Sequence, residues 1–106
     1  MRRMPTGGQV LPDKTSKTQP GQDLERLWAV FIHNDDVTPM EFVVHVLVTI
    51  FQLPSPNAAQ VMFSAHLNGK AYVQTLPKSE ARRRAGQARF AARLRGFPLE
   101  FSLESE

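Results

Sequence analysis

The chain has 106 residues, which leaves room for one domain with one modest hydrophobic core. Its composition, 42% hydrophobic and 22% charged, is that of an ordinary globular domain, and the formal net charge of +3 permits an acidic partner without requiring one. Because the chain has no cysteine, a disulfide framework, a thiolate zinc site and a cysteine nucleophile are all excluded.

Residues 1–24 are rich in proline and glycine, with few apolar residues and no periodicity. This pattern predicts a flexible N-terminal extension, which either has no function or acts as a tether, followed by a folded domain over 25–106. No apolar segment follows Arg2 and Arg3, so no secretory signal is expected. The longest apolar run, 42–51, is too short to span a bilayer.

The middle of the chain carries the strongest local signals. A short apolar strand over 27–33 ends at the polar residues Asn34, Asp35 and Asp36. A helix over 39–52 follows, and its expected start is a capping box in which Thr38 is the N-cap and Glu41 lies three residues later. These residues therefore form a polar corner between a strand and an apolar helix.

The remaining elements are separated by clear start and stop signals. The cap-plus-proline pair Ser55-Pro56 begins a second helix, Asn68-Gly69 ends it, and Ser79 is the expected cap of a third. Taken together, the pattern β-α-α-β-α-β predicts an α+β fold in which helices cover one face of a three-stranded sheet. The predicted ranges after the first helix are a helix over 56–67, a strand over 70–76, a helix over 80–94 and a strand over 98–103.

Two groups of side chains near the polar corner can carry chemistry. Asn34, Asp35, Asp36 and His66 offer oxygen and nitrogen acceptors that would satisfy an ammonium group, although an acidic pair before a helix also simply complements the helix dipole. Apolar residues on the first two helices suit either an adaptable pocket or plain core. They are Met40, Val43, Met62 and Ala65.

The third helix is rich in arginine, with Arg82, Arg83, Arg84, Arg89, Arg93 and Arg95. A solvated helix face, an acidic protein partner and nucleic acid are all possible interpretations. The single Trp and the single Tyr lie outside this run, so stacking platforms for single strands are not evident.

Metal binding and catalysis find no support in the motifs. The three histidines lack the spacing of metal ligands, and no nucleophile motif or phosphate-binding glycine loop is present. No cofactor, no metal and no enzymatic activity are therefore expected.

Three stretches resemble one protein family. The segments HNDDVTPMEFVVHVL, QVMFSAHLNGKA and GFPLEFSLE are similar to the ClpS family of bacterial adaptors, which deliver N-degron substrates to the Clp unfoldase–protease. The resemblance covers about residues 27–104. It implies a three-stranded antiparallel sheet packed against three helices, an architecture shared with the C-terminal domain of the ribosomal stalk protein.

The resemblance also implies the site and its partners. The family binds the free α-amino group and a first side chain that is Leu, Phe, Tyr or Trp, here through Asn34, Asp35 or Asp36, and His66. The pocket residues it implies are Ile32, Thr38, Met40, Val43, Met62, Ala65 and Leu99. Met40 would exclude β-branched first residues. A cytoplasmic monomer that binds the N-terminal domain of a ClpA- or ClpC-type ATPase is implied, with no membrane or nucleic-acid partner.

Three departures from the family pattern affect these expectations. His33 replaces an aliphatic residue, and its ring would narrow the pocket if it pointed inward. Ala65 stands where valine is frequent, so a larger ring such as that of Trp is expected to fit. The segment TLPKSEARRRAG lacks much of the acidic pattern that contacts the unfoldase, and Glu80 and Arg84 are the nearest counterparts.

An alternative from another functional class uses the same fold. In this interpretation the chain is a basic interaction domain whose arginine-rich helix binds an acidic protein or nucleic acid, because fold alone does not assign function. It predicts strongly salt-dependent binding and tolerance of changes at Asn34 and His66.

Overall fold

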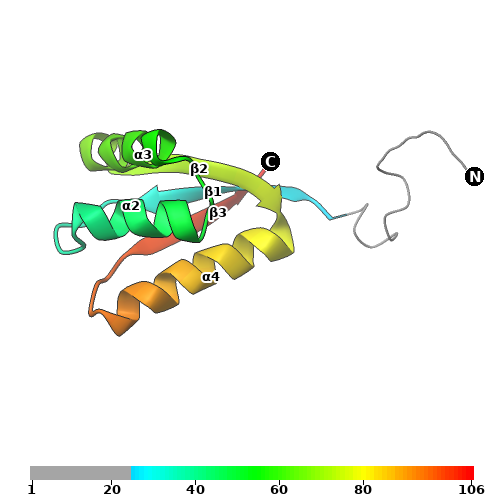
Figure 1. The fold of residues 1–106 in the computed structure, drawn as a ribbon. Coiled ribbons are helices and arrows are strands. Elements are labelled where there is room, and N and C mark those ends of the chain that lie inside the picture. The colour runs from blue at the N-terminus through cyan, green and yellow to red at the C-terminus, as the bar shows by residue number, and fades with distance from the viewer. Residues whose placement is uncertain (1–24) are drawn as a thin grey trace, which may run out of the picture.

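The computed structural model describes residues 25–106, and the predicted N-terminal extension, 1–24, lies outside them. Its elements run in the predicted order β-α-α-β-α-β (Figure 1). They are β1 (Leu27–His33), α2 (Met40–Thr49), α3 (Ser55–Asn68), β2 (Lys70–Pro77), α4 (Lys78–Leu94) and β3 (Glu100–Ser105). Within residues 25–106, no helix is both long and apolar enough to cross a membrane.

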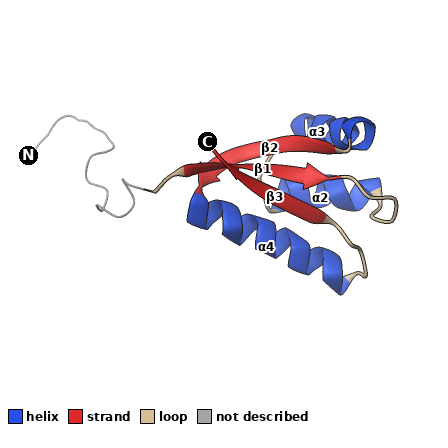
Figure 2. Ribbon diagram, turned by 180° about the vertical axis from the view of Figure 1, so that it is seen from behind, coloured by secondary structure: helices blue, strands red, loops and turns tan. Residues whose placement is uncertain are grey.

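The three strands form one antiparallel sheet in the order β2-β1-β3, so the first strand of the sequence lies in the centre. All three helices lie on the same face of this sheet: α4 contacts every strand, α3 contacts β2, and α2 packs beside α3 (Figure 1). Seen from behind, the strands lie in front of the helices (Figure 2). This arrangement confirms the α+β class and the three-stranded antiparallel sheet.

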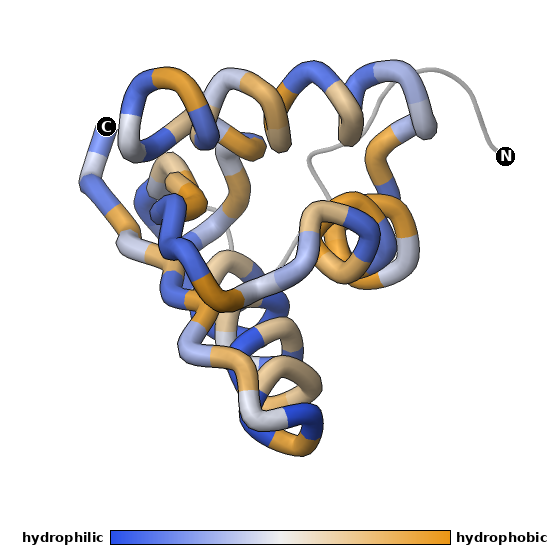
Figure 3. The backbone as a smooth tube through the Cα atoms, turned by 90° about the vertical axis from the view of Figure 1, so that its left-hand side faces the viewer, coloured by the Kyte–Doolittle hydropathy of each residue, from blue (hydrophilic) through white to orange (hydrophobic). Residues whose placement is uncertain are grey.

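The core lies between the sheet and the helices. Val30 and Ile32 of β1 meet Leu47 and Phe51 from the α2 region, and all four are at most 1% exposed. The inner face of α4 consists of buried alanines, whose small side chains let the helix lie close to the sheet. Hydrophobic and hydrophilic segments alternate along the backbone (Figure 3), as expected for elements with one buried and one exposed face.

The predicted side-chain caps are wrong for all three helices. Each helix follows a proline with ψ near 146°, namely Pro39, Pro54 and Pro77, and none has a side-chain cap hydrogen bond from its N-cap residue. Thr38 bonds to Asp35 instead, and Ser55 is already helical. Ser79 also lies within α4, where its backbone N–H donates to Glu25 Oε2 at 2.6 Å. A carboxylate from before β1 thus supplies the acceptor at this helix end.

Several predicted boundaries also shift, most clearly those of the first helix and the last strand. The first helix ends at Thr49 rather than 52, and Gln52 adopts a left-handed φ of 60°, which no helix continues through. The last strand covers Glu100–Ser105 rather than 98–103, because residues before Glu100 form a loop whose carbonyl groups bond to a side chain and not to a neighbouring strand.

Candidate functional site

The polar corner lies where β1 gives way to the loop before α2. The backbone N–H of Asn34 donates to the carbonyl oxygen of Gly69 at 2.9 Å, immediately after the end of α3. Gly69 in turn donates its N–H to Ala65 at 2.8 Å. This pair of bonds holds the last turn of α3, which carries His66, beside the corner that carries Asn34.

Asp35 stabilises its own loop. Its Oδ1 accepts from the backbone N–H groups of Val37 (2.8 Å) and Thr38 (2.7 Å), and its Oδ2 accepts from the Thr38 hydroxyl (2.9 Å). Partial burial opposes its ionisation, but these donors and the charge of Arg93 outweigh burial and hold the pKa of Asp35 below its ordinary value. Both carboxylate oxygens therefore have partners in the loop.

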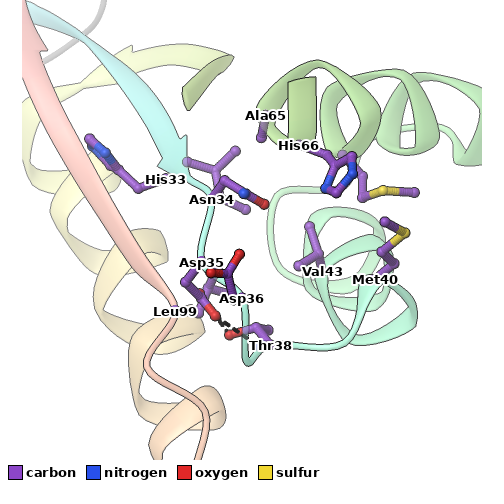
Figure 4. Close-up of a pocket in the computed structure, with 12 residues that line it drawn as sticks. His33, Asn34, Asp35, Asp36, Thr38, Met40, Val43, Ala65, His66 and Leu99 are labelled. Carbon is purple, nitrogen blue, oxygen red and sulfur yellow. Dashed lines mark hydrogen bonds between the residues drawn. The ribbon is translucent and has the colours of Figure 1, made fainter. Parts of the chain in front are cut away.

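Asp36 is exposed, whereas the neighbouring Asp35 is partly buried. In Figure 4, the carboxylate that is not bonded to Thr38 points toward the side chains of Asn34 and His66, which come from β1's end and from α3. Within residues 25–106, no side chain or backbone group bonds to the Asp36 carboxylate. The three side chains thus surround one gap with acceptors, and an ammonium group is the kind of ligand that such a gap suits.

This gap opens into a cavity with apolar walls, and the gap and the cavity together enclose about 180 Å³. Its deep walls are Ile32, Leu99 and Ala65, each at most 4% exposed, while Met40 is 41% exposed and so stands at the rim. Every pocket residue and every amino-group residue predicted from the sequence lines the same cavity. The lining residues are Ile32, His33, Asn34, Asp35, Asp36, Thr38, Met40, Val43, Met62, Ala65, His66 and Leu99.

His33 borders the cavity, but its ring does not point into it. Its Nε2 lies 2.7 Å from Ser102 Oγ of β3, on the sheet face that the helices leave uncovered. Figure 4 shows the ring directed away from Met40 and Val43. The strand alternation explains this direction, since Ile32 points to the core and its neighbour must point the opposite way. His33 therefore does not narrow the cavity.

Glu80 and Arg84 lie on the first turns of α4 and are absent from the cavity lining. Glu80 accepts bonds from Arg83 and Arg84, and Arg84 also donates to the Phe51 carbonyl oxygen (3.3 Å) and to Gln74 Oε1 (3.0 Å). Arg84 is therefore largely committed to joining α4, α2's end and β2. Its side chain is only 16% exposed.

The arginine-rich helix is not an unpaired basic face. Arg83 and Arg84 pair with Glu80, and Arg89 and Arg93 pair with Glu100. Arg93 also bonds to the loop that carries Leu99, a contact that sequence reasoning missed. A possible signal was its place in the last turn, where a basic side chain commonly bonds to nearby free carbonyl groups.

Among residues 25–106, no three His, Asp or Glu side chains gather in a way that would hold a metal ion. The acceptors at the corner are instead spread around an open gap beside an apolar cavity. The site is therefore suited to a ligand that is cationic at one end and apolar at the other.

Comparison with known proteins gives the family. The sequence model for "ClpS: ATP-dependent Clp protease adaptor protein ClpS" matches residues 23–102, most of the chain. The chain belongs to the ClpS family. ATP-dependent Clp protease adapter protein ClpS 2 of Mesorhizobium japonicum is 37% identical over 91 residues, covering 86% of this chain and 90% of the relative. ClpS 1 of Rhodopseudomonas palustris is 37% identical over 95 residues, covering 90% of this chain and 92% of that relative.

A solved ClpS structure shares the fold. Agrobacterium tumefaciens ClpS2 bound to L-phenylalaninamide matches with a TM-score of 0.74 and 36% identity, covering 77% of this chain and 99% of that one. The sheet and helix arrangement described above is thus that of a ClpS adaptor. The members of this family are adaptor proteins of the ATP-dependent Clp protease. The match to the family model and to these relatives confirms the resemblance seen in the sequence.

Proposed function

We propose that this ClpS-family chain binds the free α-amino group and the bulky hydrophobic first residue of N-degron substrates, and delivers them to a Clp AAA+ unfoldase–protease. It acts as an adaptor and not as an enzyme. The observation that carries the proposal is the direct contact between a polar gap and an apolar cavity within one set of lining residues. At a protein N-terminus, the positively charged α-ammonium group and the side chain of residue one are attached to the same Cα atom, so a polar gap beside an apolar cavity can bind both at once.

The amino group is held by three acceptors. The Asn34 carbonyl oxygen, the Asp36 carboxylate and a neutral ring nitrogen of His66 accept its three N–H donors, directly or through water. Asp36 takes this role because Asp35 already accepts three bonds within its own loop. Charge-assisted bonds of this type contribute on the order of 1.5–3 kcal/mol each, so an acetylated N-terminus is expected to bind poorly.

The first side chain enters the apolar cavity. The polar gap and the cavity together enclose about 180 Å³, and the buried walls of Ile32, Leu99 and Ala65 suit a bulky apolar side chain, so Leu, Phe, Tyr and Trp are the expected first residues. Burial of such a side chain contributes about 1.5–3 kcal/mol. Met40 at the rim and Val43 beside it crowd the entrance, which disfavours a first residue that branches at Cβ. The relative whose structure contains L-phenylalaninamide supports this class of ligand.

The unfoldase is the second partner. The proposal has the N-terminal domain of a ClpA- or ClpC-type ATPase contact Glu80 and Arg84 at the start of α4, at the surface of a cytoplasmic monomer. Glu80 is the more accessible of the two, with 30% of its side chain exposed against 16% for Arg84. Neither residue lines the cavity, so substrate and unfoldase would bind at separate places.

Fluorescence anisotropy with short labelled peptides that differ only in residue one tests the substrate part of this proposal. Leu, Phe, Tyr and Trp peptides are expected to bind, while Gly, Ile and acetylated Leu peptides are not. In the His66→Ala variant, the Leu, Phe, Tyr and Trp peptides should no longer bind more tightly than the Gly, Ile and acetylated Leu peptides. His45→Ala is the matched control, because His45 is an exposed histidine on α2 that lies outside the cavity. Equal binding of all peptides would reject the proposal.

A further inference from the structure

Arg93 of α4 bonds to the backbone of Leu99, whose side chain forms one wall of the cavity. Its Nη1 donates to the carbonyl oxygens of Phe97 (2.8 Å) and Leu99 (2.9 Å). Its Nη2 pairs with Glu100 Oε2, the first residue of β3. A single guanidinium thus bonds to three residues between the end of α4 and the start of β3.

That connection carries a wall of the cavity. Leu99 is 1% exposed and lines the cavity opposite α2 and α3. No strand ladder holds it, because β3 begins only at Glu100. Three restraints therefore hold the backbone of Leu99: the carbonyl bond from Arg93, the strand pairing that begins at Glu100, and the packing of the Leu99 side chain.

We propose that Arg93 is a positioning residue for first-residue recognition: it holds the Leu99 wall at the distance that selects the bound side chain. This inference rests on the proposed function above. Arg93 does not touch the ligand and acts through Leu99. Its charge also helps to lower the pKa of Asp35, whose carboxylate holds the loop of the polar corner.

The chemistry of the contact requires arginine. The planar guanidinium presents several N–H donors in a fixed fork, so two carbonyl groups and a carboxylate are satisfied at once. Lysine provides a compact ammonium on a flexible chain and cannot reproduce this geometry. Within residues 25–106, the Arg89 side chain bonds only to Glu100, through Nε at 2.9 Å, and to neither carbonyl oxygen. Arg89 therefore separates the role of the ion pair from that of the carbonyl bonds.

The test compares Arg93→Gln with two variants of equal charge change on the same helix. Arg89→Gln removes only the ion pair with Glu100, and Arg82→Gln removes an exposed arginine that makes no side-chain bond within residues 25–106. Dissociation constants are measured for Leu, Phe and Ile peptides. Arg93→Gln should weaken the Leu and Phe peptides about tenfold and narrow their advantage over Ile, since hydrogen bonds to charged groups are the stronger class. Arg89→Gln and Arg82→Gln should each change binding by less than roughly twofold.

The ratio between peptides separates positioning from general destabilisation, because a smaller folded fraction lowers binding of all peptides equally. The Leu99 methyl resonances give a second readout without a ligand: they should shift in Arg93→Gln and stay unchanged in Arg82→Gln. Unchanged ratios and unchanged Leu99 resonances in a folded Arg93→Gln variant would overturn the proposal. If Arg93→Gln does not fold, Arg93→Lys is measured in the same way, with the same expected direction.

Failure of the proposed function looks different. In that case the wild type itself does not distinguish Leu, Phe and Ile peptides, and the Leu99 resonances alone decide whether Arg93 holds the wall. A wild type that discriminates, together with an Arg93→Gln variant that keeps the same ratios, overturns the role of Arg93 and leaves the adaptor function intact.

Discussion

The backbone N–H of Asn34 donates to the carbonyl oxygen of Gly69 across 2.9 Å, and this bond joins the end of β1 to the end of α3. Gly69 has φ +90°, a backbone conformation that side-chain-bearing residues rarely adopt. That conformation ends α3 three residues after His66 and turns the Gly69 carbonyl toward Asn34. The relative position of two of the three proposed amino-group ligands thus depends on one glycine.

Gly69→Ala should therefore cost both stability and affinity. Nothing lies within 4 Å of an added Cβ, so the cost is backbone strain, about 1–2 kcal/mol in the free energy of unfolding. Urea denaturation measures it, and peptide binding should weaken because Asn34 shifts. Gly86→Ala is the matched control: this glycine lies inside α4 with open space around it, and alanine there should add about 0.5–1 kcal/mol. Equal effects of the two changes would contradict the argument.

The two neighbouring aspartates should separate into a structural and a ligand-binding residue. Asp35→Ala removes the acceptor of three hydrogen bonds and should lower the free energy of unfolding by about 1–3 kcal/mol. Asp36→Ala changes an exposed side chain, so its effect on stability should stay within about 0.5 kcal/mol. Its effect on binding should be large, at least about tenfold, through loss of one charge-assisted bond. Urea denaturation and peptide-binding anisotropy on both variants check these two roles. If Asp36→Ala binds peptides as tightly as the wild type, Asp36 is not the ligand-binding residue.

The sequence predicted the elements and their order because the helical periodicity, the prolines and Asn68-Gly69 are local signals. It did not predict the caps, since a proline with extended ψ can take the N-cap place and leave Thr38 free to bond elsewhere. The direction of His33 depended on which face of β1 is buried, which becomes certain only once the helices are placed on the sheet. That face places the His33 ring beside Ser102.

The members of the site were named from motifs, but their division of roles was not. Asp35 and Asp36 are chemically identical in the sequence, and only the fold of the loop gives one of them three donors. In the sequence, nothing distinguished Arg93 from the other four arginines of α4. Only the loop after the helix placed two carbonyl groups within its reach. Contacts of this kind depend on loop conformation, which periodicity does not encode.

Ala65 should set the upper size limit of the first residue. It is 4% exposed and lines the cavity, so Ala65→Val adds two methyl groups where a ligand ring would lie. Overfilling a packed site costs about 1–3 kcal/mol, and Trp and Phe peptides should weaken by about tenfold or more while the smaller Leu peptide is less affected. Anisotropy titrations give these ratios. Ala59→Val on the same helix, outside the cavity, controls for helix propensity, and a uniform loss for all peptides would argue against a size limit here.

Glu80 should make the stability of the domain sensitive to acid. Hydrogen bonds from Arg83 and then Arg84 lower the pKa of Glu80 from an ordinary 4.5 to about 2. Because the folded-state pKa lies below the unfolded one, the contribution of Glu80 to stability is complete above the unfolded value and is lost as the pH falls toward 2. Urea unfolding of wild type and Glu80→Gln should therefore differ most at about pH 6 and converge near pH 2. The pair with Arg83 is the more exposed of the two, so high salt should reduce the part of the difference at about pH 6 that this pair contributes. Glu41→Gln, which removes an exposed carboxylate that bonds to no side chain within residues 25–106, is the matched control for the loss of one negative charge. A gap between wild type and Glu80→Gln that stays constant across this pH range would mean that the carboxylate charge is not what joins Glu80 to the two arginines.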